Sequence, residues 1–333
     1  MNGTGDTDMA TLKDVAAECG LAVSTVSRIL NNRGYISDEA RQKVNDAMRR
    51  LNYYPNELAR SLHRNNSGMI GLIVPHIMHP FFSKLISCIE ESCCRRGYRL
   101  LLFNTQSAED KEAEFMQICS SNRVAGIIMC TGGLSVKQFK DFGIPVITIE
   151  RSIEYGTASV ECDNESGGRL AGELLWKKGC RKVLHFGSID SYRMPADYRY
   201  TGFAGVCASY GMECIRIPSD AAAFQKMEYH DQIESALLRY PDADGLFANS
   251  DVIGAQILQV CRKLDISVPD RMKVISFDDT FPAVNTSPRL TTVSQPISEM
   301  AELAVRLLED VTQGRIVPVK NVLPVRLIER EST

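Results

Sequence analysis

The sequence predicts a mixed fold class: an N-terminal three-helix headpiece, a hinge helix, and then a two-lobed α/β core. Two observations support this. Residues 9–31 carry two apolar stripes at helical spacing, on either side of a glycine. From Met69 onward, apolar segments of strand length alternate with amphipathic segments of helix length. Strands that are apolar throughout, with helices between them, are typical of parallel sheets covered by helices on both faces.

Length, composition and charge agree with this organisation. A chain of 333 residues is long enough for two or three domains. Its 44% apolar and 24% charged residues are ordinary for a globular protein. The formal net charge is −3, yet the segment from Ser24 to Asn66 carries eight Arg or Lys residues against four acids. The local basic excess that favours contact with phosphate therefore lies at this end of the chain.

Residues 9–31 are predicted to form two short helices joined by a tight turn. Gly20 lies where the first helix must end, because glycine tolerates a positive φ angle. Thr11 is a candidate N-cap, with Asp14 in the first turn. The apolar stripes of the two helices consist of Leu12, Val15 and Ala16, and of Val26, Ile29 and Leu30.

The second helix of this pair presents a polar face that includes Ser24, Thr25, Ser27 and Arg28. Arginine can bind guanine through two parallel hydrogen bonds, and hydroxyl groups reach phosphates or base edges. The pattern favours a helix-turn-helix that binds a DNA major groove. A small helical hairpin with a solvated polar face is the alternative.

A third helix, which begins at Ser37 or Asp38 and runs to about Leu51, is predicted to share a small core with the first two. After it, Pro55 begins a short helical segment with Leu62 on its apolar face. A helix this short needs a partner surface to fold in water, so we interpret it as a conditional hinge helix. The predicted domains are a headpiece at 1–54, a hinge helix and linker at 55–67, and a core at 68–333.

Eight strands alternating with helices are expected in the core. The predicted strands are 69–75, 98–104, 124–130, 145–150, 182–187, 214–218, 245–250 and 273–279. The predicted helices are 81–96, 109–122, 164–178, 198–211, 228–240 and 251–264. We expect two Rossmann-like lobes of four strands each, with the break near Ser159–Gly179. A ligand cleft would face the carboxyl ends of the strands.

The end of the chain is predicted to return toward the first lobe. A last helix at about 297–313 and one closing strand at 321–329 are expected to join the first lobe or the crossover. Lobe 1 would then consist of about 68–163 and 297–330, and lobe 2 of about 164–294.

Several motifs, in order along the chain, resemble those of the lactose-repressor (LacI) family of bacterial transcription regulators. The motifs are VSTVSRILN, ARSL, IGLIVP followed by HPFF, RYTGF, SD at 250–251, FDD at 277–279 and LTTVSQP at 290–296. The resemblance implies a DNA headpiece joined by a hinge helix to a core of the periplasmic-binding-protein type I. It also implies a homodimer or tetramer that binds palindromic operator DNA and responds to a small effector.

Residues that contact DNA are implied by the same resemblance. Val23 and Ser24 would open the recognition helix, and Arg28 matches the Arg of the family's TVSR motif. Leu62 resembles the hinge leucine that wedges between base pairs and kinks the duplex. Ala22 stands where serine is common, which removes a helix cap worth about 1 kcal/mol. The full candidate set is Thr11, Val23, Ser24, Thr25, Arg28, Asn31, Asn56, Ala59 and Leu62.

An effector site is implied in the cleft. Phe81 and Phe82 would form an aromatic wall, although core packing at a helix start is the alternative for either one. The planar donors of Arg199 suit ligand oxygens, with a surface salt bridge as the alternative. As a carboxylate at a strand end, Asp278 suits neighbouring sugar hydroxyls, or it caps the next turn. The remaining candidates are Glu150, where the family often has Asp, and Arg193, Phe224, Ser250, Asp251 and Gln295.

The same sequence disfavours an enzyme. It contains neither GxGxxG after a strand, nor GxxxxGK[ST], nor GxSxG. The pair His76 and His79 lacks an evident third ligand, so we expect no metal site and no cofactor. A sugar is the expected effector. A nucleoside-type or purine-type metabolite and a soluble sugar-binding protein without a regulatory role are the alternatives.

A cytoplasmic location without membrane contact is expected. The sequence has no run of 18 apolar residues and no basic start followed by an apolar stretch. The 11 cysteines lack paired spacing, which is typical of small buried side chains in a reducing compartment.

Overall fold

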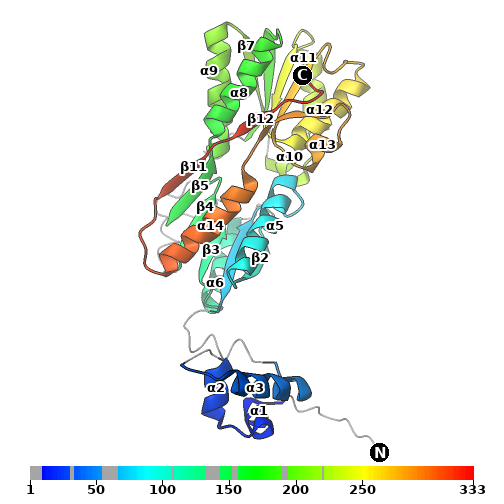
Figure 1. Cartoon of the computed structure of the whole chain (residues 1–333). Coiled ribbons are helices and arrows are strands. Elements are labelled where there is room, and N and C mark those ends of the chain that lie inside the picture. Colours follow the sequence, from blue (N-terminus) through cyan, green and yellow to red (C-terminus); the bar gives the residue numbers. More distant parts are fainter. Residues whose placement is uncertain are drawn as a thin grey trace, which may run out of the picture. The chain divides into compact units, whose positions relative to one another are not determined.

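The computed structural model describes residues 10–30, 34–54, 67–106, 109–131, 143–151, 157–189, 194–219 and 221–333. It divides into two compact units, Met1–Ser67 and Gly68–Thr333, which are considered separately here (Figure 1). The predicted hinge helix at 55–67 falls almost wholly outside the described residues, as do Asn31 and Arg193.

The first unit contains the predicted three helices: α1 (Leu12–Cys19), α2 (Val23–Leu30) and α3 (Asp38–Arg50). Thr11 and Asp14 form a capping box at the start of α1, and Gly20 ends that helix with φ of 67°. At the start of α3, the Ser37 hydroxyl accepts a hydrogen bond from the Ala40 N–H group. The core contains Val15, Ala16, Val26, Ile29, Val44 and Ala47. These observations confirm the predicted helix-turn-helix architecture.

The first lobe of the second unit is built on a six-stranded parallel sheet in the order β11-β5-β4-β3-β1-β2. Its strands are β1 (Met69–Val74), β2 (Arg99–Asn104), β3 (Gly126–Met129), β4 (Val146–Ile149), β5 (Ala158–Cys162) and β11 (Lys320–Leu323). Helices α5 (Pro80–Arg95), α6 (Glu109–Ser121) and α14 (Ile297–Thr312) belong to this lobe (Figure 1).

The second lobe is built on a second six-stranded sheet in the order β12-β10-β9-β8-β6-β7. Its strands are β6 (Lys182–Ile189), β7 (Glu213–Ser219), β8 (Gly245–Ala248), β9 (Lys273–Asp278), β10 (Thr291–Ser294) and β12 (Arg326–Ile328). Only β12 pairs antiparallel, to β10, among the strands described in this sheet. The helical segments are α8 (Asn164–Lys177), η1 (Pro195–Asp197), α9 (Tyr198–Tyr210), α10 (Ala221–Lys226), α11 (His230–Arg239), α12 (Asp251–Lys263) and α13 (Phe281–Asn285).

The prediction of two four-stranded lobes was wrong, because each sheet contains two further strands. Two of these, β5 and β10, are short and partly polar. Ser159 and Glu161 in β5 are buried, as are Thr291 and Thr292 in β10. A search for apolar runs misses strands whose buried side chains are polar but hydrogen-bonded.

The single closing strand predicted at 321–329 was also wrong. Pro324 separates β11, which pairs with β5, from β12, which pairs with β10. Proline has no N–H group to donate to a sheet, so it ends the first pairing. The chain therefore changes lobes at this point, and residues 326–328 belong to the second lobe rather than the first.

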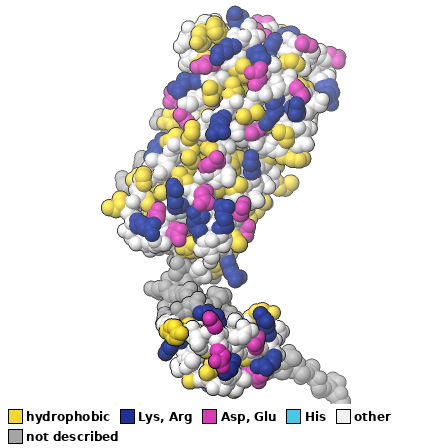
Figure 2. Space-filling model, viewed as in Figure 1, with side chains coloured by type: hydrophobic (Ala, Val, Ile, Leu, Met, Phe, Trp, Pro, Cys, Tyr) yellow, Lys and Arg dark blue, Asp and Glu magenta, His cyan; other side chains and the backbone are white. Residues whose placement is uncertain are grey.

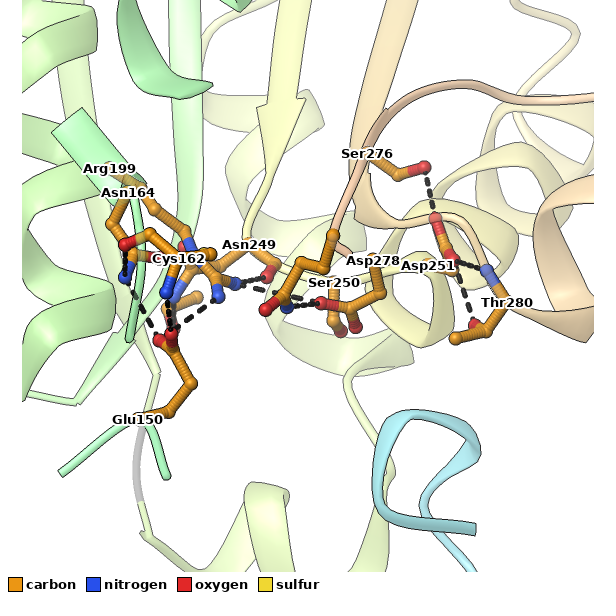
Figure 3. Close-up of polar contacts among 12 residues, drawn as sticks. Glu150, Cys162, Asn164, Arg199, Asn249, Ser250, Asp251, Ser276, Asp278 and Thr280 are labelled. Carbon is orange, nitrogen blue, oxygen red and sulfur yellow. Dashed lines mark hydrogen bonds and ion pairs between the residues drawn. The ribbon is translucent and has the colours of Figure 1, made fainter. Parts of the chain in front are cut away.

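The chain passes between the two sheets after β5, after β10 and after β11. The polar ends of several parallel strands, including Glu150, Asn249 and Asp278, meet between the lobes (Figure 3). This is the edge of open α/β sheets at which ligands bind.

Charges on the surface are mixed. In the view of Figure 2, basic and acidic side chains are interspersed over the second unit. Close pairs include Arg95 with Glu302, at 2.8 Å, and Lys182 with Asp242, at 2.9 Å. Exposed pairs of this kind contribute little to stability.

His185 lies in the core of the second lobe, in the middle of β6. It is 1% exposed, and its ring packs against those of Tyr200, Phe203 and Phe247. Neither ring nitrogen has a hydrogen-bond partner among the described residues. Burial lowers the pKa of His185 to about 3, and the positive charges of Arg216 and Arg199 act in the same direction.

We expect the His185→Phe variant to lose less stability than the wild type when the pH falls from 7.5 to 5. A histidine whose pKa is lowered on folding contributes stability above its ordinary pKa of 6.5, and this is lost as the pH falls toward about 3. Between pH 7.5 and pH 5, the unfolding free energy of the wild type should fall by about 2 kcal/mol more than that of the variant. Urea unfolding at both pH values measures this difference. Parallel pH profiles would contradict it.

Candidate functional site: the cleft between the lobes

Arg199 is the central side chain of the cleft. It lies in the first turn of α9 and is 5% exposed. Its Nε donates to Asn164 Oδ1 at 2.7 Å, and its Nη1 donates to the carbonyl oxygen of Asn249 at 2.7 Å. The guanidinium carbon lies 3.6 Å from the centre of the Phe277 ring. The alternative of a surface salt bridge is wrong for Arg199, because the side chain is buried.

Two carboxylates face this guanidinium from opposite sides (Figure 3). Glu150 Oε2 lies 3.9 Å from Arg199 Nη2, and Asp278 Oδ1 lies 3.8 Å from Arg199 Nη1. Glu150 follows β4 in the first lobe, whereas Asp278 ends β9 in the second. Both distances exceed those of direct hydrogen bonds. The three charged groups therefore attract one another without forming direct hydrogen bonds.

Glu150 and Asp278 have backbone conformations that residues other than glycine rarely adopt. The φ angle is 52° at Glu150, 114° at Asp278 and 59° at the neighbouring Asp279. Positive φ at non-glycine residues is costly and gathers at functional sites. Here it directs two carboxylates from strand ends toward one arginine.

Asp278 is held in place by a hydrogen bond from Gln295 as well as by its attraction to Arg199. It is 3% exposed, and its Oδ1 accepts a hydrogen bond of 2.7 Å from Gln295 Nε2. Burial raises the pKa of Asp278 well above its ordinary value, while the charge of Arg199 acts in the opposite direction. Asp278 and Gln295, which the sequence analysis proposed separately, thus lie together.

Aromatic side chains form another wall of the cleft. Phe81 and Phe82 are buried at the start of α5 and contact each other edge to face, with ring centres 5.1 Å apart. The ring centre of His79 lies 5.6 Å from that of Phe82 and 5.9 Å from that of Phe224, which belongs to the second lobe. Phe81 and Phe82 also belong to the apolar core, so core packing holds for both, and their contact with an effector stays a prediction.

Further polar contacts join the lobes near this wall. His76 Nε2 lies 2.9 Å from the carbonyl oxygen of Gln225, and Lys84 Nζ donates to the carbonyl oxygen of Asp279 at 3.2 Å. Each contact links the segment that follows β1 to the second lobe. Together with the contact between Arg199 and Glu150, they connect the two sides of the cleft.

Asp251 and Ser250 have structural partners. Asp251 is fully buried, and its carboxylate accepts four hydrogen bonds from Ser276, Thr280 and Thr292, at 2.6 to 2.8 Å. Burial raises the pKa of Asp251, and these hydrogen bonds act in the opposite direction. The hydroxyl of Ser250 caps α12 by accepting from the Ile253 N–H group. Both side chains therefore stabilise the scaffold behind Asp278.

Several polar atoms around the cleft are buried and have no hydrogen-bond partner among the described residues. They are His79 Nδ1, Thr131 Oγ1, Asn249 Oδ1 and Gln295 Oε1. Each residue follows the carboxyl end of a strand: β1, β3, β8 and β10 respectively. Buried polar atoms are costly without partners. Their convergence with Arg199 and two carboxylates suits a small molecule rich in hydroxyl groups.

Three side chains of this site were not predicted from the sequence: His79, Asn164 and Asn249. His79 was considered only as a metal ligand. Asn249 lies inside the predicted strand 245–250 but directly follows the observed β8, and Asn164 follows the missed strand β5. Arg151 directly follows Glu150. Burial lowers the pKa of Arg151, and the charges of Glu150, Glu112 and Asp197 act against this effect.

The first unit presents the candidate DNA-binding face of α2. Val23, Ser24 and Arg28 are exposed and Thr25 is half-buried, whereas Val26 and Ile29 point into the core. At the start of α1, Thr11 is exposed, and its N–H and hydroxyl groups both donate to Asp14 at 2.7 Å. Asn31, Asn56, Ala59 and Leu62 lie outside the described residues, as does Arg193 in the second unit.

Comparisons with known proteins match both units. Residues 11–56 match the profile of bacterial regulatory proteins of the lacI family. Residues 173–333 match that of a periplasmic binding protein-like domain. In the part of the chain that the structure describes, no helix has both the length and the apolar character to cross a membrane.

Two relatives of similar length are sugar operon repressors by name. The ribose operon repressor of Halalkalibacterium halodurans is 33% identical over 326 residues, which cover 98% of this chain and 97% of that protein. The sucrose operon repressor of Streptococcus mutans is 33% identical over 325 residues, 97% of this chain and 99% of that protein.

A solved structure resembles the second unit. It is a periplasmic binding protein/LacI transcriptional regulator from Alkaliphilus metalliredigens, in complex with D-xylulofuranose. It is 31% identical to this chain, covers 80% of this chain and 99% of its own, and has a TM-score of 0.70.

The close approach of α8 to α9 sets the backbone position of Arg199. A Cβ atom at Gly168 would lie 1.9 Å from the carbonyl oxygen of Arg199, and one at Gly202 would lie 2.0 Å from that of Glu165. Real Cβ atoms do not approach other atoms so closely. Only glycine therefore allows this helix contact.

Gly168→Ala should destabilise the second unit by about 1–3 kcal/mol or more, because the helices must separate. Gly205→Ala in α9 is the matched control, since a Cβ there has no neighbour within 4 Å. This control should be neutral or stabilising by about 0.5–1 kcal/mol, as expected for replacing glycine within a helix. Thermal unfolding compares the two. Equal melting temperatures for Gly168→Ala and the wild type would contradict the contact.

Proposed function

Because this chain belongs to the LacI family of bacterial regulatory proteins, we propose that it is a DNA-binding transcriptional repressor whose operator affinity is set by a sugar bound between its core lobes. The observation that carries the proposal is the cleft itself. A buried arginine and two carboxylates converge there from both lobes, together with amide atoms that have no hydrogen-bond partner in the part of the chain that the structure describes. The helix-turn-helix unit on the same chain supplies the reason for DNA binding.

The chemistry of the cleft supports a neutral, hydroxyl-rich effector. Hydroxyl groups both donate and accept, so they can bind Arg199 as well as the two acids. A phosphate group would place its negative charge beside the carboxyl groups of Glu150 and Asp278. Relatives named for ribose and sucrose are equally identical to this chain, and a similar solved structure holds D-xylulofuranose. These names support the sugar class without choosing a member of it.

We propose Arg199, Glu150, Asp278 and Gln295 as the polar effector contacts, with Phe81, Phe82 and Phe224 as apolar ones. Ser250 and Asp251 are left out, because their side chains are committed to the scaffold. On α2, Val23, Ser24, Thr25 and Arg28 are the proposed DNA contacts. The relatives are transcriptional repressors by name, and we propose a cytoplasmic regulator rather than an enzyme.

The proposed mechanism couples two binding sites. The sugar contacts both lobes of the second unit, so binding favours one relative position of the lobes. In a homodimer on a palindromic operator, that position sets the distance between the two headpieces. A coupling free energy of about 1–3 kcal/mol would change operator affinity by roughly 5–150-fold.

We expect Arg28→Ala to weaken operator binding by about tenfold or more, because a specific arginine contact to a base contributes about 1–3 kcal/mol. Lys43→Ala removes the same charge from the exposed face of α3, where Lys43 pairs with Glu39 at 2.9 Å. This control should change affinity by only about twofold. A mobility-shift titration on a palindromic duplex selected from a randomised pool measures both. Similar losses in the two variants would reject the base contact.

Arg199→Lys should weaken sugar binding by about tenfold or more while leaving operator binding without sugar intact. Lysine keeps the charge but cannot reproduce the planar donors of arginine. Arg169→Lys is the control, because Arg169 is an exposed residue of α8 bonded to Ser166. Calorimetric titration with D-ribose, D-xylulose and sucrose gives the affinities. An unchanged affinity in Arg199→Lys would reject the cleft assignment, and no binding of any sugar by the wild type would reject the effector class.

A further inference from the structure

Asn164 connects the two lobes through a pair of buried hydrogen bonds. It is the first residue of α8, directly after the chain leaves β5 for the second lobe, and it is 3% exposed. Its Nδ2 donates to Glu150 Oε2 at 2.9 Å, and its Oδ1 accepts from Arg199 Nε at 2.7 Å (Figure 3). One amide thus links an acid of the first lobe to the arginine of the second.

The chemistry of Glu150 and Arg199 explains why position 164 carries an amide side chain. A carboxylate only accepts hydrogen bonds and a guanidinium only donates them. At position 164, a side chain between the two must donate on one side and accept on the other. Aspartate could not donate to Glu150, and an apolar residue could do neither. The orientation of the Asn164 amide follows from the same argument.

The remaining contacts fix both partners of Asn164. Glu150 Oε1 accepts from the Cys162 N–H group at 2.6 Å, which ties the carboxylate to β5. Asn164 Nδ2 also lies 3.1 Å from the carbonyl oxygen of Cys162. On the other side, Arg199 is held by the carbonyl oxygen of Asn249 and by the face of Phe277. Asn164 therefore hydrogen-bonds both members of a pair whose own charged atoms lie 3.9 Å apart.

The hydrogen bonds of Arg199 to Asn164 and Asn249 leave some of its terminal N–H groups available to the two acids of the cleft. Those to Asn164 and Asn249 use two of the five donors of the guanidinium. The terminal nitrogens face Glu150 at 3.9 Å and Asp278 at 3.8 Å. A rotation of the guanidinium about its Nε bond would move both nitrogens, and the bond to Asn164 opposes it.

We propose that Asn164 is a positioning residue, which holds Arg199 against Glu150 across the first crossover between the lobes and so sets the geometry of the effector site. This inference rests on the proposed function for its consequence, sugar affinity. The structure without sugar already contains the hydrogen bond between Glu150 and Asn164 and the orientation of Arg199. Both can therefore be tested separately from sugar binding.

An exchange of amide and carboxylate tests the link. Asn164→Asp places two carboxylates in contact, and Glu150→Gln sets an amide NH₂ group against either the Asn164 NH₂ group or the Cys162 N–H group, so each should lower the melting temperature by several degrees, roughly 5 °C. In the double variant, the new glutamine donates to the new aspartate, which still accepts from Arg199 Nε but no longer donates to the carbonyl oxygen of Cys162. Its loss of melting temperature should be smaller than the sum of the two single losses by at least about 3 °C.

Asn122→Asp is the control for the same chemical change at an exposed position, where Asn122 Nδ2 donates to the carbonyl oxygen of Ile118 at 2.8 Å. Because an exposed hydrogen bond contributes little, its melting temperature should fall by less than about 2 °C. If the losses of the two single variants simply add in the double variant, the direct link between positions 150 and 164 is wrong.

The Nε–H resonance of Arg199 tests the positioning without any sugar. Its assignment follows from its disappearance in Arg199→Lys. In the wild type and in the double variant this proton should exchange slowly with water, and in Asn164→Ala it should shift and exchange at least about tenfold faster. An unchanged Arg199 signal in Asn164→Ala would overturn the positioning role, even if that variant were less stable.

Sugar titrations with D-ribose, D-xylulose and sucrose complete the test. Asn164→Ala leaves every proposed sugar contact in place, and it should bind the preferred sugar about tenfold or more weakly, because Arg199 loses its position. An unchanged sugar affinity in Asn164→Ala would overturn the effect on the site. Failure of the wild type to bind these sugars would count against the proposed effector class, while the melting temperatures and the Arg199 signal still decide the link.

Discussion

The buried guanidinium of Arg199, placed between two carboxylates, is the constraint on which the second unit depends. Burying a charge is costly unless it is paired and hydrogen-bonded. Here the direct bonds come from neutral groups, the Asn164 amide and the Asn249 carbonyl, and the face of Phe277 completes the enclosure. The acids remain 3.8 to 3.9 Å away. The arrangement is stable without saturating the groups that a hydroxyl-rich ligand would use.

The same constraint explains the unusual backbone around the cleft. Glu150 and Asp278 have positive φ angles, and both come directly at or after the end of a strand. The surrounding sheet must hold such conformations in place. Asp251 contributes from behind, since its four hydrogen bonds tie α12 to β9, β10 and the turn at Thr280. A rigid scaffold thus supports strained side chains at the point where ligand chemistry is needed.

The lobes themselves are joined by contacts of a different kind. His76, Lys84 and Glu150 in the first lobe each reach a polar partner in the second. Buried polar atoms without a hydrogen-bond partner among the described residues lie on both sides of the same boundary. A ligand that binds both lobes can therefore favour one arrangement over another by a few hydrogen bonds. Such a preference is the physical basis of the proposed switch, in which the free energy of sugar binding would change the affinity for DNA.

The sequence by itself determined the three-helix headpiece, the order of most strands and helices, and the choice of Arg199, Glu150, Asp278 and Gln295 as candidate effector contacts. These features follow from local signals: helical spacing, the caps at Thr11, Gly20 and Ser37, apolar runs, and polar residues at strand ends. Only the tertiary structure decided that β5 and β10 are strands, because their buried residues are polar and are satisfied by distant partners. It also decided that Pro324 sends the chain into the second lobe, and that Asp251 belongs to the scaffold. The role of Asn164 could not be predicted, since a single amide gains meaning only when folding places a donor-only group on one side of it and an acceptor-only group on the other.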